Sequence, residues 1–258
     1  MRLKGKGVVI TGGGRGIGAA TARALAEEGA SVVVSARSLE EIEAVASELR
    51  DAGHSAWAVG CDVTSDDQVA ELTRRSREHL GQVDILVNNA GIAASSPLKR
   101  VRREDWERIF AVNVTGTFLC TQAFLPSMVE NQWGRVVNIA SIAGLCGAAY
   151  ISAYSASKHA VVGFTRCLAA EVAASGVTVN AVCPGYVETE MVRQSVTNIV
   201  HKTSLSENEA RNNIVKMNPQ GRILEADEVA YQVLSLCDPR ARGINGQMIV
   251  LDGGGLLA

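Results

Sequence analysis

Residues 7–18 read Gly-Val-Val-Ile-Thr-Gly-Gly-Gly-Arg-Gly-Ile-Gly, a short apolar run that passes directly into a glycine-rich loop and then a helical pattern. Glycines in such a turn let the backbone approach a pyrophosphate, which then rests on the helix N-terminus. A plain strand–helix turn rarely needs so many glycines. The sequence therefore predicts a dinucleotide-binding loop, whose expected contacts are Gly12, Gly14, Arg15, Gly16, Ile17 and Gly18.

The same alternation of short β-branched runs and amphipathic helical stretches continues to the end of the chain. Nearly continuous apolar strands separated by helices favour a parallel sheet covered on both faces. No linker or internal repeat interrupts the pattern, so we expect a single α/β domain over 1–258, a doubly wound Rossmann sheet of about seven strands. The expected strands are Gly7–Ile10, Ser31–Ser35, Ala56–Val59, Val83–Asn88, Arg135–Ala140, Val177–Cys183 and Met248–Leu251.

One region, residues 188–217, breaks this rhythm. It is polar and contains two weak helical patterns but no strand. It follows the sixth strand, at the carboxyl edge where such sheets bind ligands. A substrate lid is the favoured interpretation because long loops at that edge are often functional, and a surface excursion without a role is the alternative.

Composition excludes several classes of function. The net charge of −2 gives no overall field that would recruit nucleic acid or an anionic membrane. The cysteines and histidines show no metal-ligand spacing, so we expect no metal site. The start of the chain lacks an apolar signal segment, and no run of about 20 apolar residues occurs, so we expect a cytoplasmic protein.

The end of the second expected strand indicates which dinucleotide binds. A site for NAD usually carries an acid there, which bonds the ribose 2′-hydroxyl. Here Ala36 stands at that position and Arg37 follows it. Arg37 and Arg15 match a 2′-phosphate, since guanidinium groups pair well with phosphate oxygens, and Ser35 or Ser38 could add a hydroxyl. NADP(H) is therefore favoured over the alternative of two surface arginines.

The third and fourth strands end in residues that suit the same cofactor. Asp62 and Val63 close the third strand, where Asp62 could accept from an adenine amino group or cap the next helix. Asn89, Ala90 and Gly91 follow the fourth strand, and small residues there let a cofactor lie across the sheet edge.

Tyr154 and Lys158 supply a candidate for acid–base chemistry. They stand four residues apart in a helical pattern, which puts both on one helix face. An ammonium close to a phenol favours the phenolate, so we expect the pKa of Tyr154 to be lowered from about 10. Tyr-x-x-x-Lys by itself is usually a solvated helix face, and the rest of the chain decides its meaning.

Together these motifs resemble the short-chain dehydrogenase/reductase family, along essentially the whole chain. The elements occur in order: Thr11-Gly12-x-x-x-Gly16-x-Gly18, Asp62, Asn88-Asn89-Ala90-Gly91, Asn113, Ser141, Tyr154-x-x-x-Lys158, Pro184-Gly185, Thr189 and Asp252-Gly253-Gly254. The resemblance implies an oxidoreductase, a homotetramer and a catalytic tetrad.

In that tetrad Ser141 holds the substrate oxygen, Tyr154 is the general acid or base, and Lys158 lowers the tyrosine pKa and binds the nicotinamide ribose. Asn113 anchors a water in a proton relay; bonding to backbone at a helix kink is its alternative role. The segment with Pro184, Gly185, Val187 and Thr189 resembles the one that holds the nicotinamide in such enzymes.

The stretches around Tyr154 and Cys183 resemble polyketide ketoreductases and 3-oxoacyl thioester reductases. We therefore expect a reductase of a 3-oxoacyl thioester or another apolar ketone. Basic residues that dock acyl carrier protein in such reductases are missing near Gln132 and Ser175, which weakens the case for that carrier. An NAD-linked dehydrogenase of the 3-hydroxybutyrate type is the alternative, although apolar residues replace its carboxylate-binding positions. A non-catalytic dinucleotide sensor is less favoured because the tetrad is complete.

Overall fold

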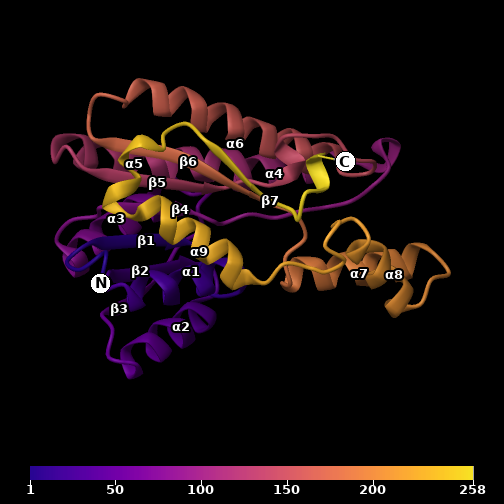
Figure 1. The fold of residues 1–258 in the computed structure, drawn as a ribbon, viewed down its shortest axis with the longest axis horizontal. Coiled ribbons are helices and arrows are strands. Elements are labelled where there is room, and N and C mark those ends of the chain that lie inside the picture. The colour runs from indigo at the N-terminus through magenta and orange to yellow at the C-terminus, as the bar shows by residue number, and fades with distance from the viewer. Residues whose placement is uncertain (258) are drawn as a thin grey trace.

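A computed structural model describes residues 1–257, and Ala258 lies outside the described residues. Ala258 ends a tail whose apolar character suggests an interface. The chain forms a parallel sheet of seven strands in the order β3-β2-β1-β4-β5-β6-β7 (Figure 1). This confirms the predicted doubly wound Rossmann domain. The strands are β1 (Gly7–Thr11), β2 (Ser31–Ala36), β3 (Ala56–Gly60), β4 (Ile85–Asn88), β5 (Gly134–Ile139), β6 (Val177–Pro184) and β7 (Met248–Leu251).

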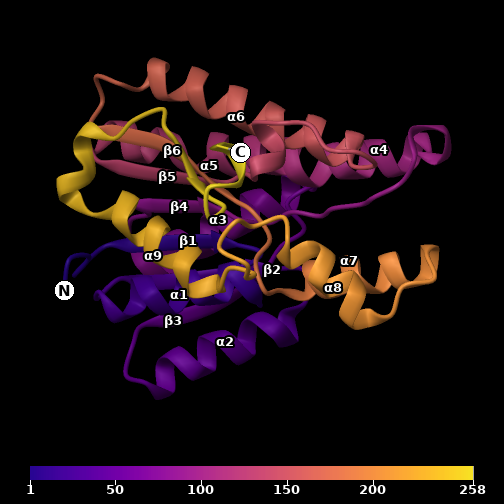
Figure 2. The same ribbon diagram turned by 45° about the vertical axis from the view of Figure 1, so that its right-hand side comes forward.

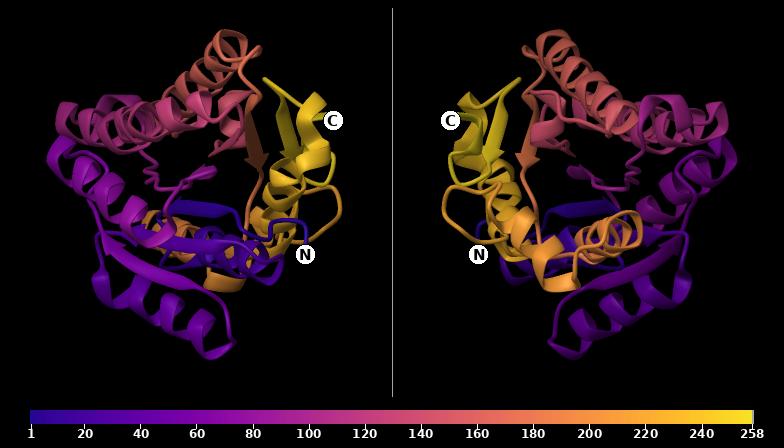
Figure 3. Two further views of the ribbon diagram at one scale, coloured as in Figure 1. Left: turned by 90° about the vertical axis from the view of Figure 1, so that its left-hand side faces the viewer. Right: turned by 90° about the vertical axis from the view of Figure 1, so that its right-hand side faces the viewer.

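Helices cover both faces of the sheet because successive strand residues point to opposite sides. In β1, Val8 and Ile10 enter one apolar core, while Val9 enters the other. The first core lies under α1 (Gly16–Glu27), α2 (Leu39–Asp51) and α9 (Ala226–Cys237). The second lies under α3 (Asp66–Leu80), α5 (Gly116–Glu130) and α6 (Ser152–Glu171). The two end views show these helix layers on either side of the sheet (Figure 3).

The direction of winding changes between β1 and β4, which are neighbours in the sheet. Ligands of such sheets bind in the crevice at this point, beyond the carboxyl ends of the strands. The glycine-rich loop follows β1, and Asn89–Gly91 follows β4. The topology therefore brings the two predicted cofactor segments together.

Residues 188–217 form two helices, as predicted: α7 (Glu190–Lys202) and α8 (Glu207–Val215). They project beyond the carboxyl edge of the sheet (Figures 1 and 2). Val192, Val196, Ala210 and Ile214 form a small apolar core between them, together with Ile223. The pair therefore has a small apolar core of its own, separate from the two cores of the sheet.

A long helical stretch, Arg103–Glu130, joins α4 (Arg103–Phe110) to α5 through a π-helical segment at Ala111–Thr115. It is long and apolar enough to cross a membrane by length and composition alone, a test that core helices of soluble proteins also pass. Here it packs against the sheet, and its exposed side carries the half-exposed ring of Phe118. Part of the apolar surface of this helical stretch therefore lies on a face that no other described element of the domain covers.

Candidate active site

The glycine-rich loop is shaped by close backbone contacts that exclude side chains. Gly12 adopts a positive φ of 63°, and a Cβ there would lie 2.9 Å from Cα of Ala90. A Cβ on Gly18 would lie 2.2 Å from the carbonyl oxygen of Gly12, far inside van der Waals contact. The loop therefore brings α1 directly against the end of β1, with the helix N-terminus facing the crevice.

Side chains from β1 and the segment after β4 fasten this loop. The hydroxyl of Thr11 accepts hydrogen bonds from the backbone N–H groups of Asn89 and Ala90, both at 3.1 Å. The Asn89 amide donates in return to the carbonyl oxygens of Thr11 (3.0 Å) and Gly12 (2.8 Å). The side chain of Asn89 is therefore used to hold the loop in place.

Arg15 and Arg37 lie at the outer rim of the crevice. Both are exposed or partly exposed, and the Arg15 side chain bonds to Glu41 at 3.3 Å. Desolvation raises the pKa of Asp62, but hydrogen bonds from Thr64 and the nearby charge of Arg37 outweigh it and hold the pKa below its usual range. Arg37 therefore lies near Asp62, on the side where the adenosine of a dinucleotide would sit.

Two details of the rim differ from the sequence predictions. The hydroxyl of Ser35 is fully buried and has no hydrogen-bond partner, so the prediction that it contacts a phosphate is wrong. Strand alternation explains this, because Ser35 shares a face with Val33, which points into the core. Asp62 does not cap α3 either; the hydroxyl of Ser65 accepts from Gln68 N at that position. Val63 is buried and packs against Gly116.

The crevice floor brings together Ser141, Tyr154 and Lys158, from the end of β5 and from α6. Lys158 is 5% exposed, and its Nζ donates to the carbonyl oxygen of Ile139 at 2.7 Å. The same Nζ lies 5.8 Å from the centre of the Tyr154 ring. Ser141 is also buried, and its hydroxyl accepts from Ala143 N at 3.1 Å. All three therefore face one small region at the carboxyl edge.

The spacing of Tyr154 and Lys158 predicted a lowered pKa for Tyr154, but in the structure the pKa of Tyr154 is raised. Burial raises it, and contact with the Ser141 hydroxyl offsets only part of the rise. Burial also lowers the pKa of Lys158 to about 8. Desolvation is the largest cause of both shifts, because a charged phenolate or ammonium loses its hydration when it is buried. The phenol is therefore protonated at neutral pH.

Asn113 lies in the π-helical segment and is 1% exposed. Its Oδ1 accepts from Ile92 N at 2.8 Å, while its Nδ2 donates to Ile92 O at 2.9 Å and to Ser157 Oγ at 3.0 Å. Ser157 in turn donates to the carbonyl of Tyr154. The alternative role, backbone bonding at a helix distortion, is thus present, and it ties the helix of Tyr154 to the segment after β4. The water-anchoring role stays a prediction.

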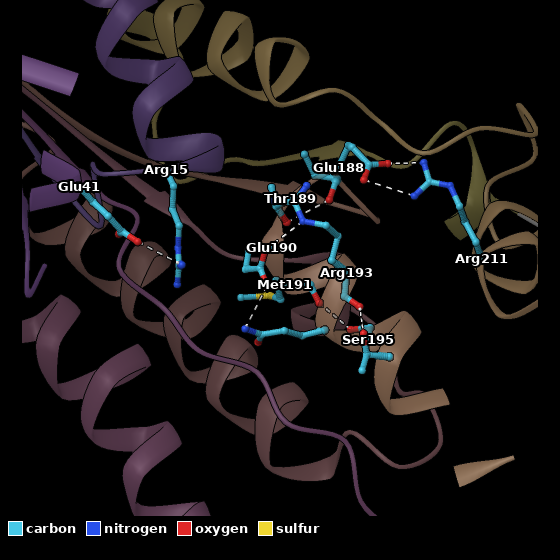
Figure 4. Close-up of polar contacts among 12 residues, drawn as sticks. Arg15, Glu41, Glu188, Thr189, Glu190, Met191, Arg193, Ser195 and Arg211 are labelled. Atoms are coloured by element: carbon cyan, nitrogen blue, oxygen red, sulfur yellow. Dashed lines mark hydrogen bonds and ion pairs between the residues drawn. The ribbon is translucent and has the colours of Figure 1, made fainter. Parts of the chain in front are cut away.

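The segment after β6 leads from the crevice to α7. The Pro184 carbonyl faces the Ser141 hydroxyl at 3.5 Å, and the Gly185 N–H donates to Leu251. Val187 forms a single parallel bridge with Leu224, and its carbonyl accepts from the Thr189 hydroxyl. A Cβ on Gly16 would meet the methyl of Thr189 at 3.0 Å. The start of α7 therefore packs on the glycine loop (Figure 4).

A family model matches most of the chain: residues 6–199 fit the model for short chain dehydrogenases. The chain belongs to the short-chain dehydrogenase family. Members of this family bind a nicotinamide dinucleotide and act as oxidoreductases. The family resemblance predicted from the motifs is therefore confirmed.

Similar short-chain dehydrogenases differ in what they act on. The chain is 39% identical in sequence to a variant of actinorhodin polyketide ketoreductase whose crystal structure was determined with NADPH. The two structures match with a TM-score of 0.94 over 97% of each chain. A 3-oxoacyl-[acyl-carrier-protein] reductase from Synechocystis is 40% identical over 95% of each chain. A D-beta-hydroxybutyrate dehydrogenase from Cupriavidus necator is 36% identical over 98% of each chain.

One glycine of this dehydrogenase site stands directly beside Asn113 and Lys158. Gly91 lies where an added Cβ would be 3.4 Å from Asn113 Oδ1 and 3.6 Å from Lys158 Nζ, so the surface beside these groups is bare backbone. In the described part of the chain, no group of three or more His, Cys, Asp or Glu side chains is arranged to bind a metal. The residues present therefore fit a dinucleotide.

Sequence reasoning named Thr11 in the loop motif without giving it a role, and it missed Glu41. Thr11 fastens the loop, and its place at the strand end was the available signal. Glu41 reaches the rim from α2, where nothing in the strand-end pattern pointed to an acid.

Proposed function

We propose that the protein is an NADP(H)-dependent oxidoreductase that interconverts a ketone and a secondary alcohol, with Tyr154 as general acid and base. The observation that carries the proposal is the convergence of Ser141, Tyr154 and Lys158 beside the bare backbone of Gly91. A hydroxyl, a phenol and an amine at one buried point suit proton transfer coupled to hydride transfer.

The bound nicotinamide would supply or accept the hydride. In reduction, the Tyr154 phenol gives its proton to the ketone oxygen, and its raised pKa keeps that proton available at neutral pH. The Ser141 hydroxyl donates a hydrogen bond to the same oxygen and stabilises the developing alkoxide. Lys158, whose pKa is about 8, returns a proton to the phenolate. Asn113 fixes the helix that carries both.

The preference for NADP(H) is supported by the rim. No acid follows β2, Arg37 lies exposed at that place, and Arg15 reaches the start of the helix that follows, where it bonds to Glu41. The similar polyketide ketoreductase was crystallised with NADPH. We expect Pro184, Gly185, Val187 and Thr189 to line the nicotinamide side, and Asp62, Val63, Asn89 and Ala90 the adenosine and ribose side.

The substrate we propose is a 3-oxoacyl thioester or another apolar ketone. Tyr150, Tyr186 and Met191 expose apolar surface near the carboxyl edge. The helices α7 and α8 would cover this surface as the substrate lid. Ala93 and Ala94 are also exposed, whereas Ala143 is buried and belongs to the packing around Ser141.

The test compares NADPH and NADH with a panel of ketones, including an acetoacetyl thioester and free acetoacetate. We expect turnover of the thioester with NADPH, and Arg37→Ala should raise the dissociation constant of NADPH by about tenfold or more, with little change for NADH. Equal or better rates with NADH would contradict the NADP(H) assignment. Turnover of acetoacetate in place of the thioester would favour the hydroxybutyrate-type alternative, which the similar dehydrogenase from Cupriavidus necator supports.

We also propose a cytoplasmic homotetramer. The apolar face of α5 and α6 supports an interface, since Phe118, Val161 and Phe164 line a shallow hollow on it. Light scattering that gives a monomer would contradict this.

A further inference from the structure

The first turn of α2 brings an acid against the glycine loop. The hydroxyl of Ser38 caps the helix by accepting from Glu41 N at 3.4 Å, which fixes the position of Glu41. A Cβ added to Gly14 would lie 2.8 Å from Cβ of Glu41, so the helix start touches the loop. From there Glu41 Oε1 lies 3.3 Å from Arg15 Nη1 (Figure 4).

The direction of the Glu41 side chain differs from that of equivalent residues in the same protein. In α8, Glu209 returns its carboxylate to the backbone N–H of the capping residue, Ser206, at 2.8 Å. In α9, Glu228 does the same to Glu225. Glu41 has the same spacing from Ser38, yet across the described residues of α2 no such return bond is present. Its carboxylate is directed to Arg15 instead.

Arg15 is therefore not a free cation at the rim. It extends between α2 and the start of α7, with Glu41 on one side and Glu190 on the other (Figure 4). Glu190 bonds to Arg193 at 2.9 Å, which satisfies most of its charge. Glu41 is thus the carboxylate that bonds directly to Arg15.

We propose that Glu41 reduces the preference for NADP(H) by competing with a 2′-phosphate for Arg15. The inference rests on the proposed function, since it assumes a dinucleotide in this crevice. A phosphate can use Arg15 fully only after the Arg15–Glu41 pair opens, and the carboxylate also repels the phosphate charge. A ribose hydroxyl carries no charge and meets neither obstacle. Glu41 thus weakens NADP(H) binding relative to NAD(H), and its removal releases Arg15.

The effect is modest because the pair is partly solvated. The Arg15 and Glu41 side chains are 64% and 40% exposed, so the pair belongs to the weak class of surface ion pairs. We therefore expect Glu41→Gln to bind NADPH about three- to fivefold more tightly than wild type, with NADH changed by less than about twofold. Glutamine is accepted at this third helical position, so α2 keeps its start.

The matched control is Glu40→Gln, which removes the same charge from the neighbouring, exposed position of the same turn. Dissociation constants for NADPH and NADH would be measured by nucleotide fluorescence for wild type and both variants, at low and high salt. Glu40→Gln should change both constants by less than about twofold, and high salt should shrink the gain in Glu41→Gln. In an Arg15→Ala background the gain should vanish.

Three results would overturn the inference while leaving the proposed function in place: equal changes for NADPH and NADH, an equal gain in Glu40→Gln, or weaker NADPH binding in Glu41→Gln. The last would mean that Glu41 orients Arg15 for the phosphate. Wild-type protein that binds neither nucleotide would overturn the proposed function as well, so the two failures are distinguishable.

Discussion

Replacing Lys158 with methionine should stabilise the fold at neutral pH while removing activity. Lys158 is 5% exposed, and burial lowers its pKa from the usual 10.5 to about 8. Each tenfold change in proton affinity is worth about 1.4 kcal/mol, so keeping this amine charged at pH 7 costs the folded state roughly 3 kcal/mol. Methionine has a similar shape and no charge to desolvate.

Part of that gain is lost elsewhere. The carbonyl oxygen of Ile139, which accepts from Lys158 Nζ at 2.7 Å, loses its partner in Lys158→Met. An unsatisfied buried carbonyl costs about 1–3 kcal/mol, so the net stabilisation at pH 7 is expected to be about 1 kcal/mol.

The pH dependence gives a sharper test than the net value. Because the pKa of Lys158 is lower in the folded chain than in the unfolded chain, its cost is fully present below about pH 8 and disappears as the pH rises toward 10.5. The stability of Lys158→Met relative to wild type should therefore fall by about 2–3 kcal/mol between about pH 7 and pH 10, so that the small advantage at neutral pH becomes a disadvantage at pH 10.

Equilibrium unfolding in urea at several pH values would measure this difference for wild type and Lys158→Met. Lys99→Met serves as the control because Lys99 is exposed, and it should change stability by less than about 0.5 kcal/mol at each pH. A difference between Lys158→Met and wild type that stays constant with pH would refute the reasoning, because the buried charge would then cost nothing.

Three further outcomes follow from the same site. Gly18→Ala should weaken NADPH binding by more than about tenfold in a fluorescence titration, because a Cβ there would lie 2.2 Å from the Gly12 carbonyl; unchanged binding would contradict the role of the loop. Asn113→Ala should lower the free energy of unfolding by roughly 2–4 kcal/mol in urea, since both backbone groups of Ile92 lose their partner. Steady-state ketone reduction should stay level from about pH 6 to pH 8, because burial raises the pKa of Tyr154, whereas alcohol oxidation should rise with pH; reduction that falls steadily over this range would contradict it.

Strand positions were predictable from the sequence because a continuous apolar run such as Val32–Val34 is typical of a strand in a parallel sheet whose two faces are both buried. The observed strands differ from the predicted ones by one or two residues at their ends, and Met248–Leu251 matches fully. The lid helices were also visible, although weak, because their apolar residues recur at helical spacing.

The environments of individual side chains were less predictable. The spacing of Tyr154 and Lys158 gave their proximity, but a sequence does not state how little water reaches a pair, and desolvation determines the pKa of both. Glu41 has the spacing of a capping residue, and only the approach of α2 to the glycine loop directs it to Arg15. Ser35 is a different case, since strand alternation with Val33 was available as a signal for its burial.

The crevice has a fixed floor and an adjustable rim. On the floor, buried side chains bond to backbone of neighbouring segments: Lys158 to Ile139, Asn113 to Ile92 and Asn89 to Thr11. Moving one of these groups disturbs a strand end, so substitutions there affect stability and chemistry together.

At the rim, the side chains of Arg15 and Glu41 are partly solvated and, within the described residues, bond to each other. Exchanging such residues leaves the strand ends in place, and each change is worth about 1 kcal/mol or less. Several changes of that size add up when the residues do not touch. Cofactor preference can therefore shift through a few rim substitutions, such as Glu41→Gln, while the proton-transfer groups on the floor stay where the sheet holds them.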